Sequence, residues 1–148
     1  MREIAQFVAV VACSLFAGAA VYITFVEHPA RMQCGVELAA TEFAPSYRRA
    51  TLMQATCAAV GLLSSLAAWL AGASLLVNCG RPTRQRHSFH VDRILPTNKR
   101  LLNPTLDKRS AEAERLLARW GRLHAVRSVL SGMAMLLFLY LAIFKKPL

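Results

Sequence analysis

Two histidines of this chain lie where a long apolar run meets charged residues. His28 ends the first run, in Glu27-His28-Pro29-Ala30-Arg31, and His124 precedes the last run, in Trp120-Gly121-Arg122-Leu123-His124-Ala125-Val126-Arg127. Ionisable groups at membrane depth are costly and tend to face the interior of a helix bundle. Both clusters are therefore candidate functional sites, and their chemistry depends on whether they meet in space.

The second cluster forms a stripe on a helix. Trp120, His124, Arg127 and Ser131 follow one another at positions i, i+4, i+7 and i+11, which places them on one helical face. The segment is otherwise apolar. The pattern therefore predicts a polar stripe with an aromatic residue at its mouth.

Together the two clusters predict a small pocket at the cytoplasmic membrane interface. Two histidines supply acid and base capacity near neutral pH. Amide, phenol and guanidinium groups supply donors for a developing oxyanion, and apolar walls suit a flat lipophilic ligand. The candidate catalytic residues are His28, His124, Asn98, Arg127, Tyr47 and Glu27. The alternative is that these groups satisfy one another and fix helix packing.

A metal site is a second use of the same side chains. His28, His124 and Glu27 resemble a set of two histidines and one carboxylate, although they are far apart in the sequence. His87 and His90 lie in a basic segment and are expected to be solvated. No Gly-rich phosphate loop, catalytic-triad signature or haem-attachment motif is present, so the sequence leaves the cofactor unknown.

The four cysteines, Cys13, Cys34, Cys57 and Cys79, include no pair with CxxC spacing. Two of them lie in apolar runs, where a thiol behaves as a small hydrophobe. We expect structural packing, with a disulfide between Cys34 and Cys79 as the open alternative.

Three apolar runs must position these residues. They cover residues 4–26, 52–76 and 129–144 of a 148-residue chain whose apolar content is 55%. Soluble cores do not need such runs, so the sequence predicts one integral membrane domain, residues 1–148, in contact with the lipid bilayer. The first run could be a cleaved signal peptide, but it continues past Ala19 to Val26, as in an uncleaved anchor.

The formal charge of +10 fits membrane orientation better than nucleic-acid binding, because no aromatic-basic RNA-binding motif accompanies it. Basic residues gather between Arg81 and Arg119. The positive-inside tendency therefore places the loop 96–119 in the cytoplasm. No nucleic-acid partner is expected, and the sequence names no oligomeric state.

Local signals set the expected helix ends. Pro29 should kink or end the first helix, and Glu27 and Arg31 can pair only if the helix continues. Residues 32–49 read as a connection in which Pro45 marks a helix start, and Ser110 reads as an N-cap. Pairs of small residues four apart favour close helix contacts: Ser14 and Gly18, Gly61 and Ser65, Ala68 and Gly72, Ser128 and Gly132.

Two topologies remain open. With three spans, His28 and His124 lie a bilayer apart. With four spans, a bend near residues 70–73 returns the chain, and both histidines lie on the same side. Charge does not choose between them, because both topologies can place the basic segment inside.

Four motifs, taken in order, resemble the anthrone-oxygenase-like family of small integral membrane proteins, whose bacterial members mostly carry a domain of unknown function. The match covers nearly the whole chain. The motifs are Phe25-Val26-Glu27-His28-Pro29-Ala30-Arg31, Pro45-Ser46-Tyr47-Arg48-Arg49, Leu95-Pro96-Thr97-Asn98-Lys99-Arg100-Leu101-Leu102 and Trp120-Gly121-Arg122-Leu123-His124-Ala125-Val126-Arg127.

The resemblance implies an all-α transmembrane bundle of four helices, with the multi-pass topology of a bacterial inner-membrane protein. Similar fungal proteins oxidise polycyclic anthrones to anthraquinones with dioxygen and without a recognised flavin or haem motif. Carried over by position, His28 or His124 is the base, and Asn98, Tyr47 and Arg127 are its polar partners. A lipophilic aromatic or quinone-like molecule is then the expected substrate.

The expected third span departs from the family pattern. Residues 80–93 are strongly basic here, which leaves residues 71–79 as the apolar part. Nine residues at about 1.5 Å each cannot cross a core of about 30 Å as a helix. We therefore expect a third span that is short or disrupted.

Two functions follow as hypotheses. The first is a membrane-bound oxygenase or oxidoreductase that is cofactor-independent or metal-assisted. The second is a non-catalytic assembly or interaction subunit, in which the buried polar residues are structural.

Overall fold

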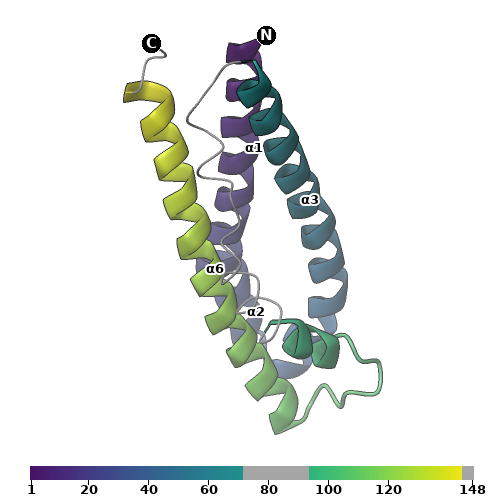
Figure 1. The fold of residues 1–148 in the computed structure, drawn as a ribbon. Coiled ribbons are helices and arrows are strands. Elements are labelled where there is room, and N and C mark those ends of the chain that lie inside the picture. The colour runs from purple at the N-terminus through teal and green to yellow at the C-terminus, as the bar shows by residue number, and fades with distance from the viewer. Residues whose placement is uncertain (72–93, 145–148) are drawn as a thin grey trace.

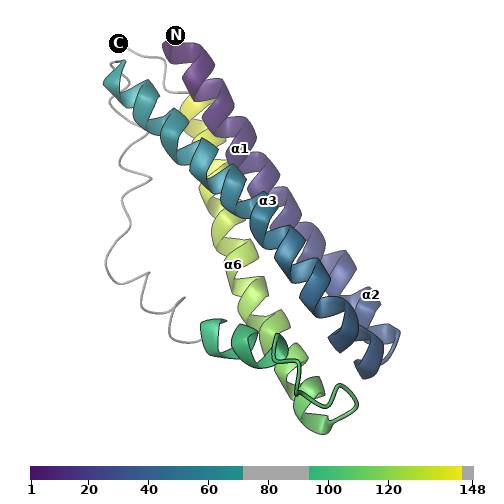
Figure 2. The same cartoon turned by 90° about the vertical axis from the view of Figure 1, so that its right-hand side faces the viewer.

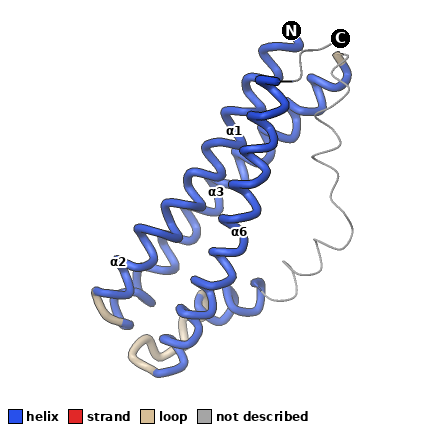
Figure 3. The backbone as a smooth tube through the Cα atoms, turned by 90° about the vertical axis from the view of Figure 1, so that its left-hand side faces the viewer, coloured by secondary structure: helices blue, strands red, loops and turns tan. Residues whose placement is uncertain are grey.

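The structure is a computed structural model that describes residues 1–71 and 94–144. Three long helices form the bundle: α1 (Arg2–Tyr22), α3 (Val36–Leu70) and α6 (Ala111–Phe144). A shorter helix covers residues 94–101. The described residues contain no strand (Figure 3). The expected all-α helix bundle is confirmed.

The first helix continues through Pro29 because the turn before it widens. A proline ring collides with the carbonyl four residues back in a regular α-helix. Here α1 passes into a π-type turn, η1 (Ile23–Glu27), in which the His28 N–H bonds to the Ile23 carbonyl five residues back. The chain then resumes as α2 (His28–Gln33). Glu27 and Arg31 therefore lie on one continuous helical face.

The turn between α2 and α3 is short, and this corrects the sequence interpretation. Residues 36–49 are helical, so Pro45 lies inside α3 and does not start it. The reversal takes place at Cys34 and Gly35, where Gly35 has a φ of 95°, a conformation that L side chains rarely adopt. One glycine thus replaces the longer connection that the mixed polarity of residues 32–49 suggested.

The start of α6 agrees with its prediction. The Ser110 hydroxyl accepts a hydrogen bond of 3.2 Å from the Ala113 N–H, as an N-cap does. The helix then runs without interruption to Phe144. Before it, Arg109 donates to Glu37 at 2.8 Å, and this hydrogen bond raises the pKa of Arg109. The pair joins the start of α3 to the loop before α6.

Figures 1 and 2 show which elements lie at each end of the bundle. We call one the terminal end, where α1 begins and α6 finishes, and the other the loop end, which contains the turn at Gly35 and residues 94–110. Helix α3 finishes at the terminal end, whereas residues 94–101 lie at the loop end. His28 and His124 both lie at the loop end, because their rings pack against Trp120 in the apolar cluster there. Beyond Ala71, the expected third span lies outside the described residues.

Three helical stretches are long and apolar enough to cross a membrane: Arg2–Gln33, Val36–Leu70 and Ala111–Leu141. Large apolar side chains point outward along them, as Leu15, Leu62 and Leu136 show with exposed fractions of 59%, 63% and 62%. Outward-facing leucine suits lipid, which is as apolar as the side chain. This is a membrane protein. The side of the membrane on which the loop 96–119 lies stays a prediction.

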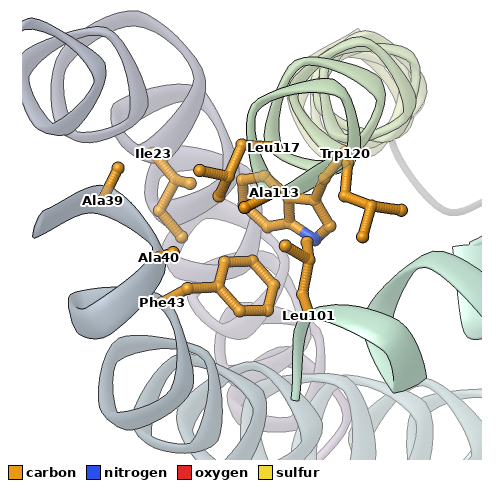
Figure 4. Close-up of a cluster of buried hydrophobic side chains, with 9 residues drawn as sticks. Ile23, Ala39, Ala40, Phe43, Leu101, Ala113, Leu117 and Trp120 are labelled. Carbon is orange, nitrogen blue, oxygen red and sulfur yellow. The ribbon is translucent and has the colours of Figure 1, made fainter. Parts of the chain in front are cut away.

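The main apolar core lies at the loop end (Figure 4). Phe43 of α3 and Leu117 of α6 are fully buried there, and Trp120 is 6% exposed. Towards the terminal end the contact between α1 and α3 is made by small residues, since a Cβ on Gly61 would lie 3.6 Å from the Ala12 Cβ. A Cβ on Gly18 or Gly132 would meet no described atom within 4 Å. The close contacts expected at those two glycines are therefore not seen in the described part of the chain.

Candidate functional site

The six predicted site residues come from η1, α2, α3, the helix 94–101 and α6, and converge at the loop end. Five of them line one cavity of about 30 Å³, a space for one or two water molecules. These five residues are Glu27, Tyr47, Asn98, His124 and Arg127.

His28, the sixth residue, lies beside the cavity and does not line it. Its ring packs edge-on against Trp120, with centroids 5.3 Å apart. On the other side it fills the space that a side chain at position 121 would need, so Gly121 is required for its placement. His28 Nδ1 is buried without a hydrogen-bond partner. The structure thus separates the roles of the two histidines, which the sequence treated alike.

His124 is held in a network of hydroxyl groups. Thr24 Oγ1 lies 3.0 Å from His124 Nδ1 and 2.7 Å from Ser128 Oγ. Both hydroxyls also reach the Ala20 carbonyl, at 3.0 Å from Thr24 and 2.8 Å from Ser128. Ser128 also bonds to the His124 carbonyl at 3.1 Å, and Nδ1 is the ring nitrogen that faces the hydroxyl network.

Trp120 links the network to the apolar core. Its ring stacks on His124 with centroids 4.7 Å apart and 27° between planes. Phe43 meets its other side edge-on at 5.2 Å, and Phe43 itself stacks on Tyr47 at 5.5 Å. Because Phe43 is fully buried, these rings fix the orientation of the His124 imidazole.

The carboxylate of the site is already neutralised. Glu27 forms an ion pair with Arg31 four residues later, as the sequence predicted for a continuous helix. Ser46 donates to Glu27 at 2.6 Å and accepts from Arg31 at 3.1 Å. Arg31, which is 5% exposed, also lies 3.4 Å from Glu42. Glu27 is therefore a structural counter-ion in this arrangement.

Arg127 has no such partner among the described residues. Its guanidinium lies 5.3 Å above the Phe16 ring, and its Nε is buried without a hydrogen bond. A buried charge without a counter-ion is costly and is normally paired or hydrogen-bonded. The cavity thus carries one positive charge in excess, because Glu27 and Arg31 cancel.

Two further groups face the same cavity with unused hydrogen-bonding capacity. Asn98 donates to the Tyr47 hydroxyl at 3.0 Å, which leaves its Oδ1 buried and unpartnered. Gln54, at 5% exposure, buries its Nε2 in the same way. Buried polar groups are nearly always satisfied, so a polar ligand atom or a water molecule in this cavity would complete the hydrogen bonding of these two residues.

Several members of the site were not predicted. Thr24 and Ser128 hold His124, Ser46 joins the ion pair, and Gln54 lines the cavity. Ser128 follows His124 by four residues and Gln54 follows Tyr47 by seven, so helical spacing could have identified both. The contribution of Thr24 depends on contact between helices about one hundred residues apart and left no local signal.

The metal alternative gains no support from the geometry of the described residues. In residues 1–71 and 94–144, no three His, Cys, Asp or Glu side chains are grouped so as to hold an ion. His28 packs against Trp120, Glu27 is paired with Arg31, and His124 is held by hydroxyls. His87, His90 and Cys79 lie outside the described residues.

No family model, curated protein or solved structure matches this chain.

Proposed function

We propose that this protein is a membrane-embedded enzyme that removes a proton from a lipophilic aromatic ketone and passes the resulting oxyanion to dioxygen. The observation that supports the proposal most directly is the pairing of an oriented histidine with an unpaired buried cation. His124 and Arg127 line the same cavity, and each has the environment that its role requires.

The proposed chemistry begins with His124. In the tautomer in which Nδ1 donates to Thr24 across their 3.0 Å contact, Nε2 would carry the lone pair of a general base. An anthrone has an acidic methylene group opposite its carbonyl, and loss of a proton there places negative charge on the oxygen. Arg127 and Gln54, which line the same cavity, would stabilise that charge because a preorganised donor in a dry site acts strongly.

Dioxygen then completes the reaction. The methylene carbon loses two hydrogens and gains one oxygen atom, which gives the quinone, and the second oxygen atom leaves with two hydrogens as water. The substrate supplies all the electrons, so the balance requires no other reductant. This agrees with the anthrone-oxygenase-like motifs around Glu27, Tyr47, Asn98 and His124.

The test is turnover of anthrone by the purified protein in lipid nanodiscs. Oxygen uptake and quinone absorbance should both exceed the protein-free rate, and His124→Ala should lower turnover by about 10²- to 10⁴-fold. Arg127→Gln should lower it comparably. Thr56→Val is a matched control, since Thr56 is exposed and bonds only to the Leu52 carbonyl of its own helix.

An absence of turnover above the protein-free rate would contradict the proposal, as would full activity of His124→Ala. The second candidate is a non-catalytic subunit, and the specific observation that favours it is the small cavity of about 30 Å³. In that case His124→Ala would lower the amount of folded protein, and the wild-type chain would leave anthrone unchanged.

A further inference from the structure

One face of α6 carries a row of cations that the proposed chemistry does not use. Arg115, Arg119 and Arg122 are all exposed, and they follow one another at positions i, i+4 and i+7 of a continuous helix. At about 100° per residue, the buried His124 lies about 180° around the helix from Arg115. This arginine row therefore points away from the bundle.

The arginine row has no acidic partner among the described residues. None of the ion pairs in residues 1–71 and 94–144 includes one of its members, and Glu112, three residues before Arg115, pairs with Arg100 at 3.7 Å. At three and four residues from Arg119 lie two leucines and the two other arginines of the row. Like charges at this spacing repel each other on a helix, and a bound anion would relieve that repulsion.

The row lies at the depth expected for the membrane surface. Residues 123–144 of α6 extend about 33 Å at about 1.5 Å per residue, which is close to a hydrocarbon core of about 30 Å. Arg122 then lies at the edge of the core, and Arg119 lies about 4.5 Å farther out, within a headgroup layer of about 5–8 Å. Arg115 lies about 10 Å out, at the outer edge of that layer. Arg119 and Arg122 are thus at the depth of lipid phosphates.

The same helical face continues towards the terminal end as an apolar strip. Four residues continue it from Arg122 at spacings of four and three: Val126, Val129, Met133 and Leu136. Their exposed fractions lie between 45% and 64%, so the strip faces lipid. A pair of cations at the upper end of a lipid-facing strip matches the form of a phospholipid, in which a phosphate is joined to acyl chains.

We propose that this face of α6 is a binding site for an anionic phospholipid, with the phosphate held by Arg119 and Arg122 and the acyl chains along the apolar strip. Arginine binds phosphate oxygens through paired N–H groups. A second copy of the chain fits this face poorly, because a two-fold dimer would set the same cations against each other. The site is independent of the proposed oxidation, since neither arginine lines the polar cavity.

The first test compares two lipids on the wild-type full chain, so that misfolding of a variant cannot decide the outcome. Phosphatidylglycerol and phosphatidylcholine with identical acyl chains are added to the protein in detergent micelles, and native mass spectrometry measures the lipid-bound fraction. Phosphatidylglycerol should bind at least about tenfold more tightly, because each arginine near a membrane surface attracts a net negative headgroup. Equal binding would overturn the proposal and favour an acidic protein partner for the arginine row.

The second test locates the preference. Arg119→Gln combined with Arg122→Gln should reduce it to less than about threefold. Lys99→Gln combined with Lys108→Gln is the matched control, since both lysines are exposed, precede α6 and form no ion pair with a described residue. This control removes the same charge from the same end and should keep the wild-type preference. Equal losses in the two double variants, or no loss in the arginine variant, would overturn the proposal.

A third measurement separates a lipid from free phosphate, which offers the same oxygens to the two arginines. Inorganic phosphate at millimolar concentration has no acyl chains to place on the apolar strip, so it should leave phosphatidylglycerol binding within about twofold of its original value. Displacement of the lipid by inorganic phosphate would show that the site takes a soluble anion and would overturn the assignment to a phospholipid.

Discussion

The loop end and the terminal end of this bundle bury different kinds of residue. At the loop end, Phe43, Leu117 and Trp120 form an apolar cluster, and Trp120 also packs against both histidine rings. Towards the terminal end the buried positions of α1 are alanines, and the large side chains face outward. Bulky residues with polar partners fix one geometry at the loop end. Small residues let the helices approach closely, and an apolar groove of about 250 Å³ lies between α1, α3 and α6.

The largest difference should appear when one large apolar residue is removed from each region. Phe43→Ala deletes a fully buried ring that holds Trp120 and Tyr47, and should lower the free energy of unfolding by about 3–5 kcal/mol. Leu136→Ala removes a side chain that is 62% exposed and should change it by less than about 0.5 kcal/mol. Unfolding in mixed detergent measures the free energy of unfolding of both variants. Similar losses for the two variants would show that the ends do not differ in packing.

A smaller effect should follow when the buried ion pair is broken. Glu27→Gln removes the nearest carboxylate from Arg31, whose side chain is only 3% exposed. We expect a loss of about 2 kcal/mol, below the usual cost for a buried pair because Glu42 and Ser46 remain. Glu42→Gln is the control, since Glu42 is more distant and 46% exposed, and it should have the smaller effect. The reverse order would mean that Glu42 is the main partner.

The smallest and sharpest comparison uses one substitution at two glycines. At Gly121 a methyl group would overlap the His28 ring, whereas at Gly61 it would make an ordinary contact with Ala12. Gly121→Ala should therefore cost about 1 kcal/mol after the gain in helix propensity. Gly61→Ala should be neutral or stabilising. Thermal unfolding of both variants in detergent tests this prediction, and equal melting temperatures would show that His28 moves aside without cost.

Much of the fold was predictable because its signals are local. The apolar runs predicted the membrane helices, the hydroxyl of Ser110 predicted the start of α6, and the spacing of Glu27 and Arg31 predicted their pairing. The prediction that a helix starts at Pro45 was wrong. The helix begins nine residues earlier, after Gly35 reverses the chain. A proline inside a helix and a proline at a helix start give the same local pattern.

The candidate site was predictable as a set of residue types but not as an arrangement. Helical spacing placed His124 and Arg127 on one face, and both line the cavity. That His28 lies outside it, packed between Trp120 and Gly121, follows only from how α2 meets α6. The hydroxyl of Thr24 reaches His124 in the same way, across helices that are distant in sequence.

By itself the sequence determined that this chain lies in a membrane, which stretches are apolar enough to cross it and which side chains could do chemistry, because these depend on runs and spacings along one helix. The tertiary structure alone decided that both histidine rings pack against Trp120 and that Arg127 has no carboxylate beside it among the described residues. The physical reason is that lipid and a neighbouring helix are equally apolar surroundings for leucine. The apolar pattern of a membrane helix therefore does not determine which of its faces points towards the other helices.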